Sequence, residues 1–312
     1  MTIHGIHHVT AIASDPQPNL DFYIGLLGLR LVKRTINFDD PGTYHFYFGD
    51  AVGTPGTILT FFPWPGARRG TRGAGEIDAT AFAIPAGSVG YWIERLKDYH
   101  VSAERVPERF GEEVIRLADT DGMLLELIAS SRDGEFQPWT DGPVPAEHSI
   151  RGIHSVSAAL ESHEGTATLL TETFGFRLVQ GTGNRFRFAA PGGGGAGRTI
   201  DLIRRSASQS GRLGAGSVHH LAFRVRDDAE QNAWREKLVT LGYDVSPMMD
   251  RVYFHSIYFR EPGGVLFEIA TDPPGFTTDE TVAELGASLR LPPGMETGRP
   301  DIERILPGIT LV

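Results

Sequence analysis

The chain repeats itself, and this repeat constrains the fold more than any other feature of the sequence. The segment GIHHV at 5–9 recurs as GIHSV at 152–156, and GLRLV at 28–32 recurs as GFRLV at 175–179, each 147 positions later. A repeat of this length indicates that one structural unit was duplicated, so both copies should share a fold. The sequence therefore predicts two equivalent halves within its 312 residues.

A second set of matches has an offset of 142: GMLLELI at 122–128 matches GVLFEIA at 264–270, and Arg109 matches Arg251. Offsets that differ by a few residues are what duplication leaves when a loop is later shortened. We expect the part beyond the repeat to form a tail that packs over the C-terminal half. The predicted divisions are an N-terminal domain at 1–135, a linker at 136–150, a C-terminal domain at 151–275 and the tail at 276–312.

Each half shows the same order of elements twice: a strand, a helix and then three short strands. The first module has a strand near 5–13, followed by a helix that begins after Ser14 and ends at Gly28. Further helices are expected at 88–99 and 227–242. Four βαβββ modules result, and the fold class is α+β.

Because the modules are copies, a residue that only the fold requires should recur at every equivalent place. His8 is replaced by Ser155 in the third module, and His220 corresponds to Ala79 in the second. The fold therefore does not need either histidine, and both become candidates for chemistry.

One carboxylate does recur. Glu126 and Glu268 occupy equivalent positions on strands that are otherwise apolar, GMLLELIA and GVLFEIA. A carboxylate among such neighbours must be paired or must bind a metal, because burying it alone is costly. For Glu126 we expect a structural role, with Arg109 or Arg116 as its partner.

A His-His pair near the start of the first module, a second pair near the start of the fourth, and Glu268 together indicate a metal site. The sequence contains no cysteine, so any metal must use histidine and carboxylate. Neighbouring side chains on a strand face opposite sides, so each pair should supply one ligand. Two imidazoles and one carboxylate form the set that holds non-haem Fe(II) and leaves coordination positions open.

Composition favours small-molecule chemistry. The 29 Lys and Arg residues against 39 Asp and Glu give a net charge of −10, which disfavours attraction to nucleic acid or to anionic membranes. No segment is apolar for long enough to span a membrane, and the N-terminus lacks the features of a signal peptide, so we expect a cytoplasmic protein. The glycine-rich run at 192–197 lacks the Lys-Ser/Thr of a phosphate loop and is interpreted as a turn.

Residues 3–272 resemble the vicinal oxygen chelate superfamily, which includes glyoxalase I, bleomycin-resistance proteins and extradiol dioxygenases. Three runs are similar to its hydroquinone-cleaving and ring-cleaving dioxygenases: GIHHVTAIASDPQPNLDFYIGLLGLRLVKRTINFDDP, GSVHHLAFRV and DRVYFHSIYFREPGGVLFEIATD. The resemblance implies that the modules pair into two domains, each a curved mixed sheet that forms a cup. It also implies one metal ion, Fe(II) or else Mn(II), held by His8, His220 and Glu268 between the first and fourth modules.

The activity implied by this resemblance is insertion of dioxygen into a dihydroxylated aromatic compound of the hydroquinone or catechol type. The same resemblance gives pocket roles to His7, Thr10, His219, Arg251 and Tyr258. Arg251 keeps a permanent charge that can stabilise negative charge on oxygen, Tyr258 can donate a hydrogen bond, and His219 can take a phenolic proton. Each also has a plain structural interpretation: a surface salt bridge, a packed aromatic ring and a hydrogen-bonded neighbour of a ligand.

Catechol-cleaving extradiol enzymes take all their ligands from the C-terminal half, which Ser155 prevents here unless His154 substitutes. The repeat places His154 opposite His7, which disfavours that substitution. Two other functions stay open. One is a glyoxalase I-like isomerase or lyase, which typically uses two glutamates, and the other is a drug-binding protein of the bleomycin-resistance kind, usually half this length. The sequence determines neither the aromatic substrate nor whether the chain forms a homo-oligomer.

Overall fold

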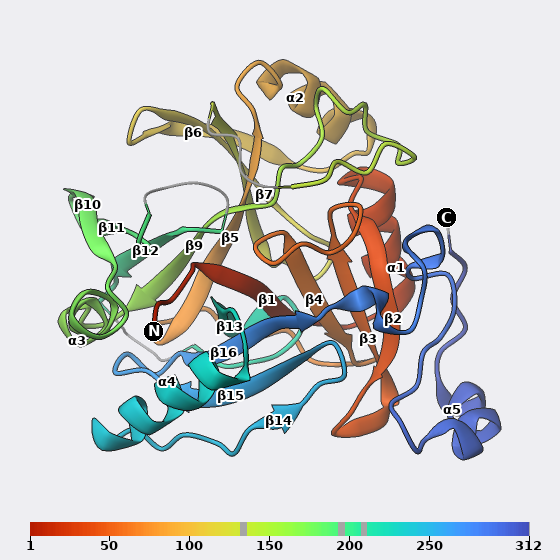
Figure 1. The fold of residues 1–312 in the computed structure, drawn as a ribbon. Helices are drawn as coiled ribbons and strands as arrows, with labels where there is room; N and C mark the ends of the chain where they lie inside the picture. Colours follow the sequence, from red (N-terminus) through yellow and green to blue (C-terminus); the bar gives the residue numbers. More distant parts are fainter. Residues whose placement is uncertain (132–135, 193–196, 207–210, 312) are drawn as a thin grey trace.

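The computed structural model describes residues 1–131, 136–192, 197–206 and 211–311. Within this part of the chain, the main strands form two eight-stranded sheets, and each sheet combines parallel with antiparallel pairs. Both sheets curve, as Figure 1 shows, which confirms the predicted α+β fold of paired modules with cup-shaped sheets. Most of the glycine-rich run at 192–197, predicted to be a turn, lies outside the described residues.

The first sheet has the strand order β14-β15-β16-β13-β1-β4-β3-β2. Its strands are β1 (Ile6–Ala13), β2 (Arg30–Asn37), β3 (Asp40–Gly49), β4 (Ile58–Pro63), β13 (Ser217–Val225), β14 (Met249–Asp250), β15 (Phe254–Arg260) and β16 (Leu266–Pro274). The second sheet has the order β10-β11-β12-β9-β5-β8-β7-β6. Its strands are β5 (Glu76–Pro85), β6 (Ala103–Arg109), β7 (Glu112–Ala118), β8 (Leu124–Ser130), β9 (Ile153–Leu160), β10 (Arg177–Thr182), β11 (Arg185–Ala189) and β12 (Thr199–Arg204).

The sheets do not follow the halves of the sequence. β1 pairs antiparallel with β13, which joins the first module to the fourth, and β5 pairs antiparallel with β9, which joins the second to the third. Each half of the chain therefore contributes strands to both sheets. The boundaries expected between the halves stay a prediction, but any site in one cup draws on both halves. We call the sheet with β1 and β13 the first cup and the other sheet the second cup.

Equivalent residues pair in the same way in the two cups. In the first cup His220 pairs with Thr10, and in the second cup the equivalent Ala79 pairs with Ser157. Cross-strand partners project from the same face of a sheet, so equivalent residues occupy equivalent places in space. The repeat in the sequence is thus a repeat in three dimensions.

The helices follow the first strand of each module. In the second and fourth modules they are α2 (Val89–Asp98) and α4 (Asp228–Thr240), which lie within the ranges predicted from the sequence. Asp227 caps α4 by accepting a hydrogen bond from the backbone N–H of Glu230. Among the described residues no helix has the length and apolar character needed to cross a membrane.

In the first and third modules the helix is divided. In the first module α1 (Pro16–Leu20) continues as a π-helical turn, η1 (Asp21–Leu26), and the chain leaves it at Gly28, whose φ of 70° favours glycine. The third module repeats this arrangement with α3 (Glu164–Thr168) and η2 (Leu169–Thr173). The predicted first helix is therefore present, with an irregular second half.

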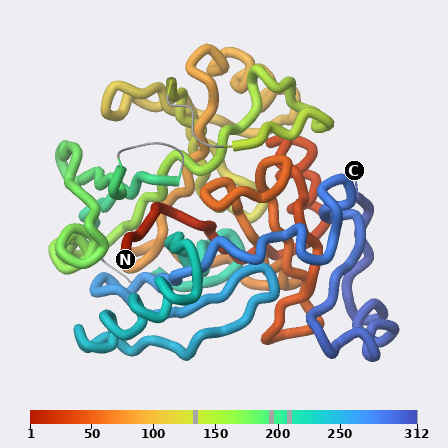
Figure 2. The backbone as a smooth tube through the Cα atoms, in the orientation of Figure 1, coloured from red at the N-terminus to blue at the C-terminus, as the bar shows by residue number. Residues whose placement is uncertain are grey.

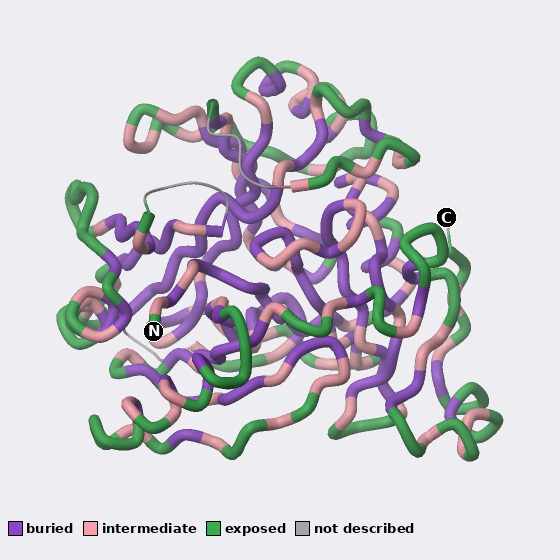
Figure 3. Tube along the Cα trace, in the orientation of Figure 1, coloured by how far each residue is buried: buried purple, intermediate pink, exposed green. Residues whose placement is uncertain are grey.

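The sheets and helices share one large apolar core. The module helices bury large side chains against it, among them Tyr23, Trp92 and Trp234, each at most 2% exposed. Figure 3 shows buried chain running through the central strands, while exposed chain lies in the outer loops and in the C-terminal tail. This continuous packing holds both cups in one body.

The C-terminal tail does not pack mainly over the C-terminal half as expected. It runs beside β2 and β3 of the first module to α5 (Arg299–Ile305), as Figures 1 and 2 show. One contact that holds it there is made by Lys33, whose fully buried ammonium group lies 2.6 Å from the Asp279 carboxylate and also contacts Glu280. A buried ammonium group needs anionic partners, and the tail supplies them. The short 3₁₀ turns of the tail are η3 (Phe276–Thr278), η4 (Val282–Glu284) and η5 (Glu296–Gly298).

Candidate metal centre

The strand register brings two of the predicted ligands to either side of one small residue. Ala222 on β13 pairs with His8 on β1 and with Glu268 on β16, so both side chains project from the face on which Ala222 lies. His220 lies two residues before Ala222 and shares that face. The methyl group of Ala222 leaves space between the three longer side chains, and they meet above it.

The ligand atoms of these three residues lie close together. His220 Nε2 is 2.9 Å from Glu268 Oε2, His8 Nε2 is 3.5 Å from the same oxygen, and the two Nε2 atoms are 3.3 Å apart. All three residues are buried, and among the described residues this is the group of histidine and acidic side chains close enough to hold a metal ion. Their convergence was predicted from the sequence.

This geometry fits a metal ion. Ligand atoms bound at about 2.0–2.2 Å to one ion, at right angles or somewhat wider, lie about 3.0–3.5 Å from one another. Glu268 accepts a hydrogen bond from Ser256 Oγ on Oε1 at 2.5 Å, whereas its buried Oε2 accepts none. A buried carboxylate oxygen without a hydrogen bond is costly unless a cation meets it. Oε2 is the oxygen that faces both imidazoles.

The charge on Glu268 is favoured by its neighbours. Burial opposes ionisation, but the imidazoles of His8 and His220 outweigh it and hold the pKa of Glu268 well below its usual value. The donor set is therefore one carboxylate and two imidazole nitrogens, which suits Fe(II) or Mn(II).

Each predicted ligand histidine is hydrogen-bonded to the histidine before it. His7 Nδ1 lies 2.9 Å from His8 Nδ1, and His219 Nδ1 lies 2.8 Å from His220 Nδ1. Burial, followed by the adjacent histidine, lowers the pKa of His7 well below its usual value and that of His219 to about 3. These imidazoles are neutral, so each can accept the Nδ1–H of its neighbour and leave the Nε2 lone pair of His8 and His220 toward the centre.

Three other residues predicted for the pocket stand around the centre. Thr10, Arg251 and Tyr258 line the same pocket as His8, His220 and Glu268. Arg251 Nε donates to Tyr258 Oη at 3.3 Å, and burial followed by the charge of Glu268 raises the pKa of Tyr258, so the phenol stays protonated. Arg251 also lies 3.3 Å from Asp39, at the tip between β2 and β3. The structure thus places a fixed cation and a neutral donor beside the three predicted ligands.

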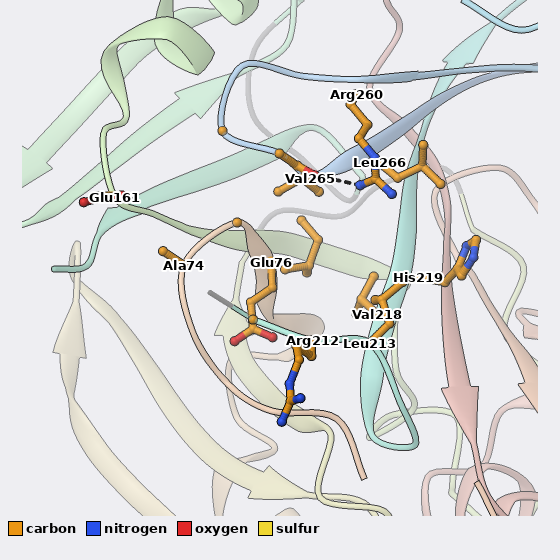
Figure 4. Close-up of a pocket in the computed structure, with 15 residues that line it drawn as sticks. Ala74, Glu76, Glu161, Arg212, Leu213, Val218, His219, Arg260, Val265 and Leu266 are labelled. Atoms are coloured by element: carbon orange, nitrogen blue, oxygen red, sulfur yellow. Dashed lines mark hydrogen bonds between the residues drawn. The ribbon is translucent and has the colours of Figure 1, made fainter. Parts of the chain in front are cut away.

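His219 also borders a second pocket, of about 370 Å³. Figure 4 shows Glu76, Arg212 and Arg260 around it, with the His219 ring at its edge and turned away from Glu76 and Arg212. Arg260 donates to the carbonyl oxygen of Gly264. His219 therefore lies between this pocket and His220, and neither His7 nor His219 lines the pocket with the three ligands.

The first-cup pocket contains residues that the sequence did not single out. They come mostly from β3 and from the hairpin before it: Asn37, Phe38, Asp39, His45, Tyr47, Phe62 and Phe254. Comparison of the repeats could have found two of them, because His45 and Tyr47 face the same side of β3 while their equivalents in β11 are arginines. The missing step was alignment of the third strand of each module, where sequence similarity is low.

Glu126 has the structural role that was expected. Its carboxylate makes two hydrogen bonds with Arg109, at 2.6 and 2.8 Å, and a longer one with Arg116 at 3.4 Å. His154 bonds to Glu112 and to Ser155 in the second cup, away from the three ligands. Both partners named for Glu126 are confirmed.

Comparison with known proteins places the chain in a family. The model of the Glyoxalase/Bleomycin resistance protein/Dioxygenase superfamily matches twice, at residues 5–127 and 152–269. The chain is 46% identical over 300 residues to the Bacillus subtilis (strain 168) protein named "Putative ring-cleaving dioxygenase MhqO", covering 96% of this chain and 95% of that protein. It is 37% identical over 310 residues to the "Chlorohydroquinone/hydroquinone 1,2-dioxygenase" of Sphingobium indicum, covering 97% and 96%.

Solved structures agree with this placement. A Bacillus subtilis protein described as a putative dioxygenase superposes with a TM-score of 0.95 at 44% identity and covers 100% of this chain and 99% of its own. Glyoxalase I from Zea mays, at 14% identity with 86% of this chain and 92% of its own covered, superposes with a TM-score of 0.63 and shares the fold. The superfamily predicted from the sequence is thereby confirmed. The chain belongs to the Glyoxalase/Bleomycin resistance protein/Dioxygenase superfamily, within which its relatives at 37–46% identity are named as ring-cleaving or hydroquinone dioxygenases.

Proposed function

We propose that this protein is an Fe(II)-dependent dioxygenase that cleaves the ring of a dihydroxylated aromatic compound, with the ion held by His8, His220 and Glu268. The observation that carries the proposal is the meeting of three ligand atoms within 3.5 Å, in the cup whose repeat counterpart has Ser155 and Ala79 instead. A bound ferrous ion would supply open positions at which the aromatic compound and dioxygen meet.

The chain's own residues then act around that ion. Arg251 offers a permanent positive charge toward negative charge that develops on oxygen, and Tyr258 offers a protonated hydroxyl. Thr10, which lies on β1 and pairs with His220 on β13, offers a hydroxyl group. Phe62 and Phe254 give the pocket two aromatic walls, which suit a flat ring.

We assign His7 and His219 a positioning role, since each hydrogen-bonds a ligand imidazole and neither lines the pocket with the ligands. A fixed Nδ1 contact orients the ligand ring and raises its basicity. The prediction that His219 takes a phenolic proton stays a prediction. A proton that reaches His219 from the substrate must pass through His220 or through water.

The test is anaerobic loading of metal-free protein with Fe(II), and separately with Mn(II), followed by measurement of oxygen consumption with a panel of hydroquinones and catechols. We expect about one bound ion per chain and oxygen uptake with at least one hydroquinone. A loaded protein that consumes no oxygen with any of these compounds would refute the proposal. Isomerisation of a thiol conjugate by the same sample would instead favour the glyoxalase I-like alternative.

A further inference from the structure

A row of polar side chains crosses the floor of the first cup, next to the candidate metal centre. His220 pairs with Thr10, Thr10 with Thr60, and Thr60 with Tyr47, across β13, β1, β4 and β3. His45 lies two residues before Tyr47 on β3 and therefore shares its face. Thr10, His45 and Tyr47 line the same pocket as the three ligands.

These side chains form one continuous chain of hydrogen bonds. Tyr47 Oη lies 2.9 Å from His45 Nδ1, His45 Nε2 lies 3.0 Å from Thr60 Oγ1, and Thr60 Oγ1 donates to Thr10 Oγ1 at 2.8 Å. Thr10 and Thr60 are fully buried, and Tyr47 is 1% exposed. Buried polar chains of this kind hold their members in fixed orientations when every group is satisfied.

The direction of one bond sets the others, because each hydroxyl or neutral imidazole has one hydrogen to give. Thr60 gives its hydrogen to Thr10, so it must accept the Nε2–H of His45. His45 Nδ1 then carries the lone pair that accepts the hydroxyl hydrogen of Tyr47. In this direction every hydrogen in the chain has an acceptor except the one on Thr10, at the end beside His220.

The two titratable members of the chain, His45 and Tyr47, are both uncharged. Burial, followed by the imidazoles of His8 and His220, lowers the pKa of His45 well below its usual value. Burial raises the pKa of Tyr47 well above its usual value. The chain is therefore neutral from end to end, and each of its members has a single hydrogen to give.

The second cup shows that the fold does not require a neutral chain there. The register equates Thr60 with Asp201, His45 with Arg185 and Tyr47 with Arg187. Those residues are also joined: Arg185 Nη1 and Arg187 Nε each donate to the Asp201 carboxylate at 2.8 Å. A charged network fills the same positions in the cup that lacks the metal ligands. The neutral chain is peculiar to the cup that has them.

We propose that Tyr47, His45 and Thr60 are positioning residues that hold the Thr10 hydroxyl as a hydrogen-bond donor toward an oxygen atom of the aromatic substrate. The inference rests on the function proposed above, and it assigns to that pocket a place where a phenolic oxygen, rather than an apolar ring substituent, is recognised. Thr10 makes the contact with substrate, and the other three residues act through it.

The test uses one substitution that interrupts the chain of hydrogen bonds without changing the shape of the side chain, and a second that restores the hydroxyl group. Thr60→Val keeps the shape of the side chain but removes the hydroxyl that links His45 to Thr10, whereas Thr60→Ser restores the link. Tyr47→Phe interrupts the chain at its other end. For each variant and the parent, we would measure bound Fe(II), the thermal midpoint, the Kd of hydroquinone under anaerobic conditions, and KM and kcat with oxygen.

We expect Thr60→Val to raise the Kd and KM for hydroquinone about five- to tenfold, the effect of losing one hydrogen bond, with kcat changed less and full Fe(II) content. Thr60→Ser should lie within about twofold of the parent. Should Thr60→Val fail to fold, Tyr47→Phe gives the same decision, with a smaller increase expected. Equal Kd and KM in parent and variant, or a Thr60→Ser protein as weak as Thr60→Val, would overturn the inference. A parent that neither binds hydroquinone nor consumes oxygen would overturn the proposed function itself.

Discussion

The two cups differ in the groups that face their buried glutamate. Each buries a glutamate at the same position on an apolar strand. In the second cup Arg109 meets Glu126 through two hydrogen bonds, so the cation belongs to the protein. In the first cup Glu268 faces two imidazoles and keeps one oxygen without a hydrogen bond. The difference teaches that the same buried carboxylate is neutralised by a guanidinium in one cup and left free to meet an added cation in the other.

Arg251, the counterpart of Arg109, explains why no guanidinium group of the described residues pairs with Glu268. It stands at the equivalent place in the first cup but bonds to Tyr258 and Asp39, with no ion pair to Glu268 among the contacts of the described residues. The tyrosine occupies the position of Arg116 in the second cup. An arginine held away from the carboxylate leaves room for an external cation and keeps its own charge for the pocket.

The largest effect should come from exchanging the two glutamates for their amides. Glu268→Gln removes the anionic ligand, so we expect loss of bound Fe(II) and of all oxygen consumption. Glu126→Gln, at the equivalent position, should keep full metal content. Metal analysis of both folded variants decides between them. Equal loss from both, or metal retained by Glu268→Gln, would show that the wrong cup has been assigned.

The second-largest effect should come from removing the hydrogen-bond donors around the candidate metal centre. Arg251→Ala and Tyr258→Phe should lower kcat by about 10²–10³-fold if each stabilises charge that develops in the reaction, as loss of one oxyanion-hole donor does. Both proteins should retain their metal. Turnover at full Fe(II) occupancy is the measurement. A variant as fast as the parent would leave Arg251 or Tyr258 with a packing role alone.

The matching change in the second cup should act on stability instead. Arg109→Met leaves Glu126 buried with the longer contact to Arg116, and breaking such a buried pair typically costs about 3 kcal/mol of unfolding free energy. Fe(II) content should stay that of the parent. Chemical unfolding with metal analysis tests both statements. An Arg109→Met protein of parental stability that has lost its metal would show that the cups are coupled.

Much of this arrangement was predictable from the sequence because the duplication acts as an internal control. The loss of His8 and His220 at their repeat positions made both histidines candidates, and the family resemblance completed the set of ligands with Glu268. Family resemblance supplied Thr10, Arg251 and Tyr258, which do line the pocket.

The repeat alone did not predict which modules pair, which only the family resemblance implied, and the position of the tail was not predicted correctly. Strand partners are set by contacts distant in sequence, and the pairing of β1 with β13 spans more than two hundred residues. The tail follows the buried ammonium of Lys33, which the sequence does not distinguish from a surface lysine. His45 and Tyr47 were missed because β3 resembles β11 only in alternation.

The smallest effect should appear as a dependence of stability on pH that belongs to the second cup. Burial opposes the charge on Glu112, but hydrogen bonds and charge from His154 and Arg187 outweigh it and lower its pKa to about 2. A carboxyl whose pKa is lower in the folded protein adds stability above its unfolded pKa, near 4.5, and that stability is lost as pH falls toward 2. Glu112→Gln should therefore lower the unfolding free energy at pH 7, with the difference from the parent shrinking below pH 4. The matched control is Glu113→Gln, because the salt bridge of Glu113 to Arg105 is exposed and should contribute little. Denaturant unfolding of the three proteins at pH 7, 4 and 3 measures the difference, and a gap between parent and Glu112→Gln that stays constant with pH would contradict the assignment.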